Sequence, residues 1–123
     1  SDNKRVEFAG ANNPLWKITN KKIEEIKGDK QPIGIFSGEL IPFTNHIIDI
    51  EKGDTLYIFT DGYADQFGGE NGKKFKYKQI QTMLLDINDK SMSKQEDYLN
   101  KSINEWKGKL EQVDDILLIG IRV

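Results

Sequence analysis

A nearly continuous apolar run leads directly into an acidic turn in the stretch Thr55-Leu56-Tyr57-Ile58-Phe59-Thr60-Asp61-Gly62-Tyr63-Ala64-Asp65. A strand with one face in water alternates apolar and polar residues, whereas a strand covered on both faces is apolar at almost every position. The run therefore predicts a central strand over 55–60. The carboxylate of Asp61 follows at the strand end, where the chain turns at Gly62, and such ends often carry ligand-binding side chains.

Further strands are expected before this run. Apolar residues and turn residues predict short strands near 6–8, 15–18 and 22–27, separated by Asn-Asn-Pro and Gly-Asp turns. The β-branched segment 46–50 predicts another strand. The simplest interpretation is that a Lys-Gly-Asp turn joins this strand to the 55–60 strand.

Beyond Tyr77 the apolar spacing changes to a helical period. One face of each of two helices is formed by Ile80, Met83, Leu84 and Ile87, and then by Leu99, Ile103, Trp106 and Leu110. Ser93 followed by Glu96 predicts a capping box at the start of the second helix, and Gly108 is expected to end or distort this helix. A mostly apolar strand over 116–121 follows.

Strands, two helices and a returning strand predict an α+β fold, with helices packed on a mainly antiparallel sheet. The chain has 123 residues, about the size of one domain, so residues 1–123 are expected to form a single domain.

Composition narrows the class of protein. Hydrophobic residues make up 37% and charged residues 31%, the net charge is -2, and there is no cysteine. Near-neutral charge disfavours nucleic-acid binding, because phosphate contacts need a surplus of Lys and Arg. The lack of cysteine fits the cytoplasm. No run approaches the ~20 apolar residues that cross a bilayer, so no direct membrane insertion is expected, although the chain fits the cytoplasmic part of a membrane-bound sensor.

A second acidic pair, Asp114-Asp115, precedes the final strand much as Asp61 follows the central one. Two such carboxylate sites are able to converge on one hard cation such as magnesium, manganese or calcium. Because His46 is the only histidine in the sequence, a metal site built from several histidines is excluded. The alternative is that these aspartates are turn residues or solubilising charges.

Two other motifs are excluded by spacing. A calcium-binding EF-hand loop starting at Asp61 needs Asp or Asn where Tyr63 stands, and a phosphate loop needs Ser or Thr where Lys74 stands. The glycine-rich segment containing Gly68, Gly69 and Gly72 is either a mobile flap or a long turn.

Four segments in this order resemble the PPM-type, protein phosphatase 2C-like serine/threonine phosphatases of the stage II sporulation protein E class. They are Ala9-Gly10-Ala11-Asn12-Asn13-Pro14, Gln31-Pro32-Ile33-Gly34, Gly53-Asp54-Thr55-Leu56-Tyr57-Ile58-Phe59-Thr60-Asp61-Gly62 and Gln112-Val113-Asp114-Asp115-Ile116. The resemblance runs nearly end to end. It implies the C-terminal portion of an α-β-β-α sandwich.

The resemblance also implies site residues. Asp61 and Asp114 match metal ligands, and Asp115 matches a secondary position that orients a ligand or holds water. Gly62 is a further secondary candidate. Asp65 either adds a water-mediated or structural contact or caps the strand end. The segment with Gly68, Gly69 and Gly72 matches a region that approaches substrate. The implied reaction is hydrolysis of phosphoserine or phosphothreonine by water that two Mn²⁺ or Mg²⁺ ions activate, with no protein nucleophile.

The sequence departs from the family pattern in one respect. The earlier Asp-Gly motif, which carries the aspartate that bridges the metals, is not found before Ala9. We therefore expect weak or absent metal binding and an inactive fragment of an active phosphatase. The alternative is a degenerate, non-catalytic interaction domain, or a generic α+β domain whose motif matches are accidental.

The resemblance further implies partners. It suggests a phosphorylated regulatory protein as substrate, such as a STAS-type anti-sigma-factor antagonist. It also suggests an upstream sensor domain in the same polypeptide, for which this chain would be the output.

Overall fold

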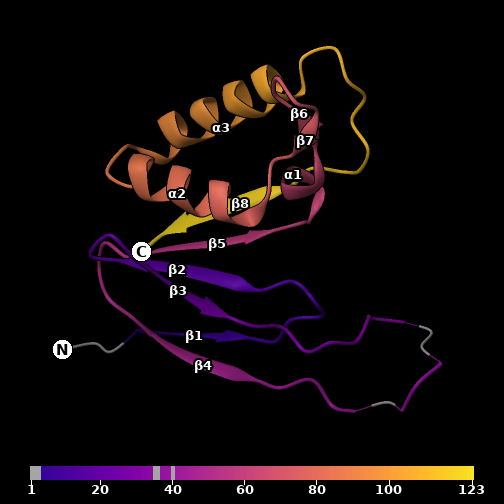
Figure 1. Ribbon diagram of the computed structural model, residues 1–123. Coiled ribbons are helices and arrows are strands. Elements are labelled where there is room, and N and C mark those ends of the chain that lie inside the picture. Colours follow the sequence, from indigo (N-terminus) through magenta and orange to yellow (C-terminus); the bar gives the residue numbers. More distant parts are fainter. Residues whose placement is uncertain (1–3, 35–36, 40) are drawn as a thin grey trace. The chain divides into compact units, whose positions relative to one another are not determined.

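The computed structural model describes residues 4–34, 37–39 and 41–123. The chain divides into two compact units (Figure 1). The first, here called the sheet unit, comprises Ser1–Phe59 and Gly120–Val123, and the second, the helical unit, comprises Thr60–Ile119.

Six strands belong wholly or partly to the sheet unit: β1 (Lys4–Phe8), β2 (Leu15–Thr19), β3 (Lys22–Ile26), β4 (His46–Ile50), β5 (Thr55–Phe59) and β8 (Leu118–Arg122). β1 and β4 form a two-stranded sheet, and the other four form a sheet in the order β3-β2-β5-β8. The pairs β1 with β4, β2 with β3 and β2 with β5 are antiparallel. The predicted strands before Thr60 are thus confirmed.

The core of the sheet unit lies between these two sheets. Its buried members are Leu15, Ile26 and Leu56 from one sheet and Ile48 and Ile50 from the other. Val6, Phe8 and Val123 pack against this cluster. Sheet-on-sheet packing of this kind buries alternate residues of each strand.

The predicted turn between β4 and β5 is confirmed, although these two strands do not pair with each other. A turn at Gly53, with φ +96, does join them, but β4 pairs with β1 and β5 pairs with β2. The physical reason is the alternation in β4, where Ile48 and Ile50 are buried while Ile47 is 61% exposed. This alternation places β4 opposite the larger sheet rather than beside β5.

The central position predicted for β5 is confirmed, because β5 lies between β2 and β8. Leu56, Tyr57 and Phe59 are buried, and Ile58 is 38% exposed. The ring of Phe59 packs on that of Trp16, with centroids 4.3 Å apart.

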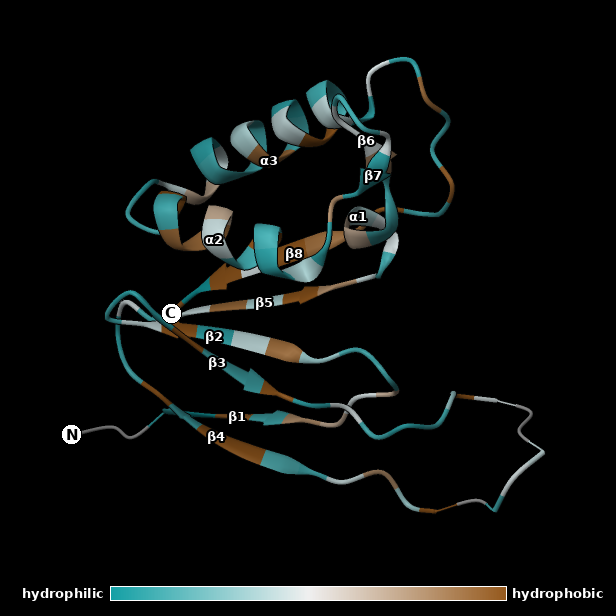
Figure 2. Ribbon diagram, viewed as in Figure 1, coloured by the Kyte–Doolittle hydropathy of each residue, from teal (hydrophilic) through white to brown (hydrophobic). Residues whose placement is uncertain are grey.

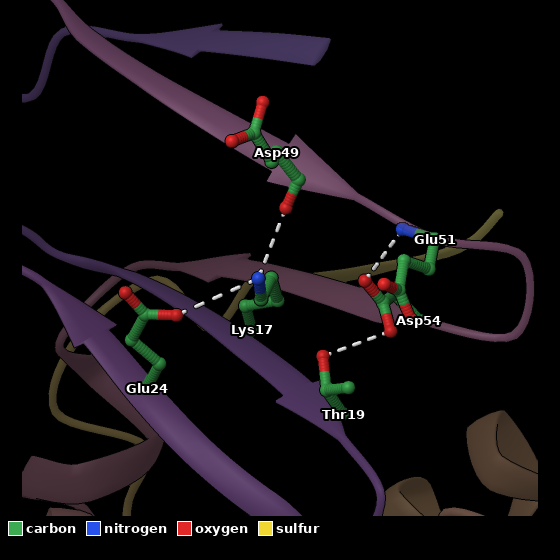
Figure 3. A network of polar contacts seen from close by, with 6 residues as sticks. All are labelled: Lys17, Thr19, Glu24, Asp49, Glu51 and Asp54. Atoms are coloured by element: carbon green, nitrogen blue, oxygen red, sulfur yellow. Dashed lines mark hydrogen bonds and ion pairs between the residues drawn. The ribbon is translucent and has the colours of Figure 1, made fainter. Parts of the chain in front are cut away.

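A polar network closes the turn before β5 (Figure 3). The buried carboxylate of Asp54 accepts hydrogen bonds from the Thr19 hydroxyl at 2.8 Å and from the Glu51 amide at 2.8 Å. Lys17 donates to the Asp49 carbonyl at 3.0 Å and lies 3.5 Å from the Glu24 carboxylate. The carboxylate of Asp54 therefore forms its hydrogen bonds within the sheet unit.

The helical unit contains α1 (Gly62–Asp65), β6 (Phe67–Gly68), β7 (Lys73–Lys74), α2 (Tyr77–Ile87) and α3 (Met92–Lys107). Both α2 and α3 carry hydrophobic and hydrophilic residues (Figure 2). The predicted inner faces are confirmed, since Ile80, Met83, Leu84, Ile87, Leu99 and Ile103 are buried. In the portion of the chain that the structure describes, no helix is long and apolar enough to cross a membrane.

The start of α3 (Met92–Lys107) differs from the sequence prediction. The N-cap of α3 is Ser91, whose hydroxyl accepts from the Lys94 amide at 3.3 Å, so the capping box at Ser93 is wrong. Gly108 ends α3 as predicted, and Leu110 lies beyond the helix.

The final strand also differs. β8 runs over Leu118–Arg122 rather than 116–121, and it is an outer strand of its sheet in which Ile119 and Ile121 are 41% and 52% exposed. Sequence hydrophobicity alone does not reveal whether a neighbouring element covers such a strand.

Candidate metal site

Asp61 begins the helical unit's first helix with an exposed carboxylate. It is the N-cap residue of α1, yet its side chain makes no capping hydrogen bond. Its main-chain carbonyl accepts from the Asp65 amide at 2.9 Å. The carboxylate is therefore not used by its own helix and faces solvent.

Thr60 joins the segment before Asp61 to the segment after Asp114. Its hydroxyl donates to the Asp115 carbonyl at 2.9 Å and accepts from the Leu117 amide at 3.0 Å. Its own amide donates to the Leu117 carbonyl at 2.9 Å. These bonds place the two acidic segments side by side within the helical unit.

Gly62 permits their close approach. A Cβ atom at this position would collide with the Asp115 carbonyl oxygen and would lie 2.8 Å from the Asp115 carbonyl carbon. Because real Cβ atoms do not come so near, only glycine fits without displacing that segment. This close approach is the local role of Gly62, and its secondary role in a metal site stays a prediction.

Asp114 and Asp115 lie on an exposed loop before β8. The Asp115 amide donates to Asp114 Oδ1 at 2.7 Å, and Gln112 Nε2 donates to the Asp114 carbonyl at 2.9 Å. These local bonds fix the orientation of the Asp114 carboxylate. The sequence prediction that the Asp61 and Asp114 segments converge agrees with this placement, and their role as metal ligands stays a prediction.

Carboxylate oxygens, the donors present in these two segments, are of the type that hard divalent cations bind. Exposed carboxylates from two segments are the ligands that Mg²⁺ and Mn²⁺ prefer. Their number is small, and the described residues contain no group of three or more His, Cys, Asp or Glu side chains placed to hold a metal ion. The arrangement is therefore suited to be part of a metal site that other ligands complete.

Asp65 takes a structural position. It is the last residue of α1, and its Oδ1 lies 3.3 Å from Lys74 Nζ on β7. The predicted strand-end cap does not occur, because α1 separates Asp65 from β5.

The glycine-rich segment forms a short hairpin, in which β6 pairs antiparallel with β7. A Cβ on Gly68 would collide with the Trp106 carbonyl oxygen, and one on Gly69 would lie 2.7 Å from the Trp106 ring. The Gly69 amide also donates to the Trp106 carbonyl at 2.9 Å. Gly72, with φ +59, has no atom within 4 Å of such a Cβ. The turn interpretation thus fits better than a mobile flap.

Aromatic contacts anchor α1 and the hairpin to α3. The Tyr63 ring meets Phe75 edge to face at 5.1 Å, and Phe75 meets Trp106 likewise at 5.3 Å. The Tyr63 hydroxyl donates to the Leu99 carbonyl at 2.8 Å. Burial, and secondarily the neighbouring Tyr98, raises the pKa of Tyr63 above its ordinary value, so this hydroxyl remains a donor.

Sequence reasoning missed the hydrogen-bonding roles of Thr60, Gln66 and Trp106. The Trp106 Nε1 group donates to the Gln66 carbonyl at 2.9 Å, although the helical period predicted only an apolar contact for that residue. Nothing in the sequence distinguishes Gln66 from a surface glutamine.

Comparison with known proteins places this chain in a family. The family model of stage II sporulation protein E (SpoIIE) matches residues 1–123. No curated protein matches the chain significantly.

Several solved structures share the fold. The SiaA-PP2C domain of Pseudomonas aeruginosa has 30% identity and a TM-score of 0.87, and the match covers 97% of this chain and 46% of that chain. The PP2C phosphatase domain of SpoIIE from Bacillus subtilis, solved with a fragment of its regulatory domain, has 15% identity and a TM-score of 0.74, covering 97% and 34%.

A manganese-presoaked structure of the phosphatase domain of Bacillus subtilis SpoIIE has 14% identity and a TM-score of 0.66, covering 98% of this chain and 51% of that chain. The chain thus spans about half or less of the length of these three structures. It belongs to the stage II sporulation protein E family and has an α+β fold that matches part of the PP2C phosphatase domain.

Proposed function

We propose that the complete gene product is a metal-dependent protein serine/threonine phosphatase in which Asp61 and Asp114 hold a divalent cation. The single observation that carries the proposal is the junction at Gly62, where the Asp115 backbone packs against the start of α1. This junction lays the exposed segments that carry Asp61 and Asp114, which are far apart in the sequence, next to each other. Membership of the SpoIIE family supports the same assignment.

In this proposal the chain's own residues bind the cation and orient its ligands. Asp61 and Asp114 supply carboxylate oxygens, Asp115 orients Asp114 through its amide, and the exposure of all three leaves room for a phosphorylated side chain. A bound Mn²⁺ or Mg²⁺ would supply an acidified water for attack on phosphorus. The remaining ligands would come from outside the described residues, so the 123-residue chain alone would bind metal weakly and be inactive.

The proposed substrate is a phosphoserine or phosphothreonine protein, such as a STAS-type anti-sigma-factor antagonist. The proposed setting is the output end of a bacterial signalling protein, in the cytoplasm, under a sensor domain in the same polypeptide. The cysteine-free sequence supports a reducing compartment.

The test is phosphate release from a phosphoserine protein by the complete gene product with Mn²⁺. Asp61→Asn should lower kcat/KM by more than ~100-fold, because even residues behind metal ligands typically cost 10–100-fold when replaced. Asp65→Asn is the matched control, since Asp65 pairs with Lys74, and it should change the rate less than about threefold. Unchanged turnover in Asp61→Asn would refute the assignment.

The second candidate is a non-catalytic domain that binds a partner protein. It is favoured by the finding that the described residues contain no group of three or more His, Cys, Asp or Glu side chains placed to hold a metal ion. Complete lack of hydrolysis by the complete gene product, with any divalent cation, would support this candidate.

A further inference from the structure

Gln66 follows α1 and is completely buried, with 0% of its surface exposed. Its side-chain Nε2 donates to the Glu111 carbonyl at 2.9 Å and to the Phe67 carbonyl at 3.0 Å. The first bond crosses to the loop that carries Asp114. A buried glutamine thus links the end of α1 to the candidate metal site.

The loop itself has little else to order it. Residues 111–117 form no helix or strand, and the side chains of residues 109–115 are all exposed. Without buried apolar side chains, such a segment is ordered mainly by hydrogen bonds. Gln66 provides one at Glu111, and Thr60 provides others at Asp115 and Leu117.

Further hydrogen bonds connect the neighbourhood of Glu111 to Asp114. Next to Glu111, the Gln112 side chain donates to the Asp114 carbonyl at 2.9 Å, and Asp114 Oδ1 accepts from the Asp115 amide at 2.7 Å. A shift of Glu111 therefore moves the residues that orient the Asp114 carboxylate.

The side-chain oxygen of Gln66 also bears on its role in holding the loop. Its Oε1 atom is buried and has no hydrogen-bond partner among the described residues. A buried acceptor without a partner is unfavourable, and a methionine of similar size would fill the space without it. The Nε2 group, which donates to Glu111, is therefore the part of the amide that favours glutamine at this position.

We propose that Gln66 is a positioning residue for the metal site, because it holds the Asp114 loop next to the Asp61 segment. This inference rests on the proposed function. Gln66 does not bind the cation; it acts through Glu111 and the loop.

The test uses the complete gene product with Gln66→Met, which removes the donor but keeps the size. Amide hydrogen exchange over residues 110–117 should become at least about tenfold faster. The Kd for Mn²⁺, measured by calorimetry, should rise about 10-fold or more, as for other groups that orient metal ligands.

Gln95→Met is the matched control. Gln95 is also a buried glutamine, 1% exposed, and its Nε2 donates to the Lys90 carbonyl at 3.1 Å, in the connection between α2 and α3. Its replacement should leave both the exchange of residues 110–117 and the Mn²⁺ affinity unchanged. An equal loss in both variants would show a general effect on stability and overturn the proposal.

Two further outcomes also overturn it: unchanged exchange in the loop, and faster exchange with unchanged Mn²⁺ affinity. If Gln66→Met does not fold, the exposed Gln112→Met removes the next hydrogen bond in the series and should raise the Kd in the same way. If the wild-type gene product binds no Mn²⁺, the proposed function fails, and so does the metal-positioning role. The exchange measurement then still decides whether Gln66 holds the loop.

Discussion

At the scale of single residues, the candidate site depends on atoms that approach very closely. Gly62 has no room for a methyl group because the Asp115 carbonyl lies against it. The Thr60 hydroxyl donates a hydrogen bond to the same Asp115 carbonyl and accepts one from the Leu117 amide. Small residues around Asp61 are therefore as important to the geometry as the carboxylates themselves.

Gly62→Ala should displace the Asp115 segment. We expect a loss of about 1–3 kcal/mol in the free energy of unfolding, as for other overpacked positions, measured by urea denaturation. Amide exchange at residues 115–117 should become faster, because the added Cβ pushes on Asp115 and strains the Thr60 bonds.

Gly72→Ala is the control for this prediction. Its φ of +59 also disfavours a side chain, but a Cβ there meets nothing within 4 Å. It should destabilise the chain by about 1–2 kcal/mol without changing exchange at residues 115–117. Faster exchange there in both variants would contradict a local collision at Gly62.

At the scale of elements, the start of α3 gives a direct test of helix capping. Ser91→Ala should lower the free energy of unfolding by about 1 kcal/mol, because the Lys94 amide loses its acceptor. Ser93→Ala, within the helix and exposed, should change it by less than about 0.5 kcal/mol. Thermal or urea unfolding of both variants measures these losses. A larger loss in Ser93→Ala than in Ser91→Ala would identify Ser93 as the N-cap instead.

Periodicity predicted which elements exist but not which neighbours they have. The helical spacing of Ile80, Met83 and Leu84 identifies α2 because burial of one face is a local property of the sequence. The pairing of β4 with β1 is a long-range property, which the local sequence of either strand does not encode. The exposure of Ile119 and Ile121 on β8 likewise depends on what lies beside the strand.

The candidate site was partly visible in the sequence for a similar reason. Asp61 and Asp114 are recognisable by residue type and by their place next to apolar strands. Gln66 is recognisable only through its burial and its bond to Glu111, which no local pattern encodes.

At the scale of the whole molecule, metal affinity should depend on how much of the domain is present. The chain covers 46% of the SiaA-PP2C chain, and its described residues hold no cluster of three or more potential ligands. Affinity for hard divalent ions rises with the number and charge of carboxylate ligands. We therefore expect the 123-residue chain to bind Mn²⁺ at least about 100-fold more weakly than the complete gene product does.

Calorimetric titration of both proteins, each with its Asp61→Asn and Asp114→Asn variants, makes this measurement decisive. In the complete gene product each substitution should weaken binding by more than ~10-fold, because each removes a charged oxygen donor. In the 123-residue chain the same substitutions should abolish what binding remains. Equal affinity of the two wild-type proteins would mean that Asp61, Asp114 and their neighbours suffice, and that the site needs no ligand from elsewhere.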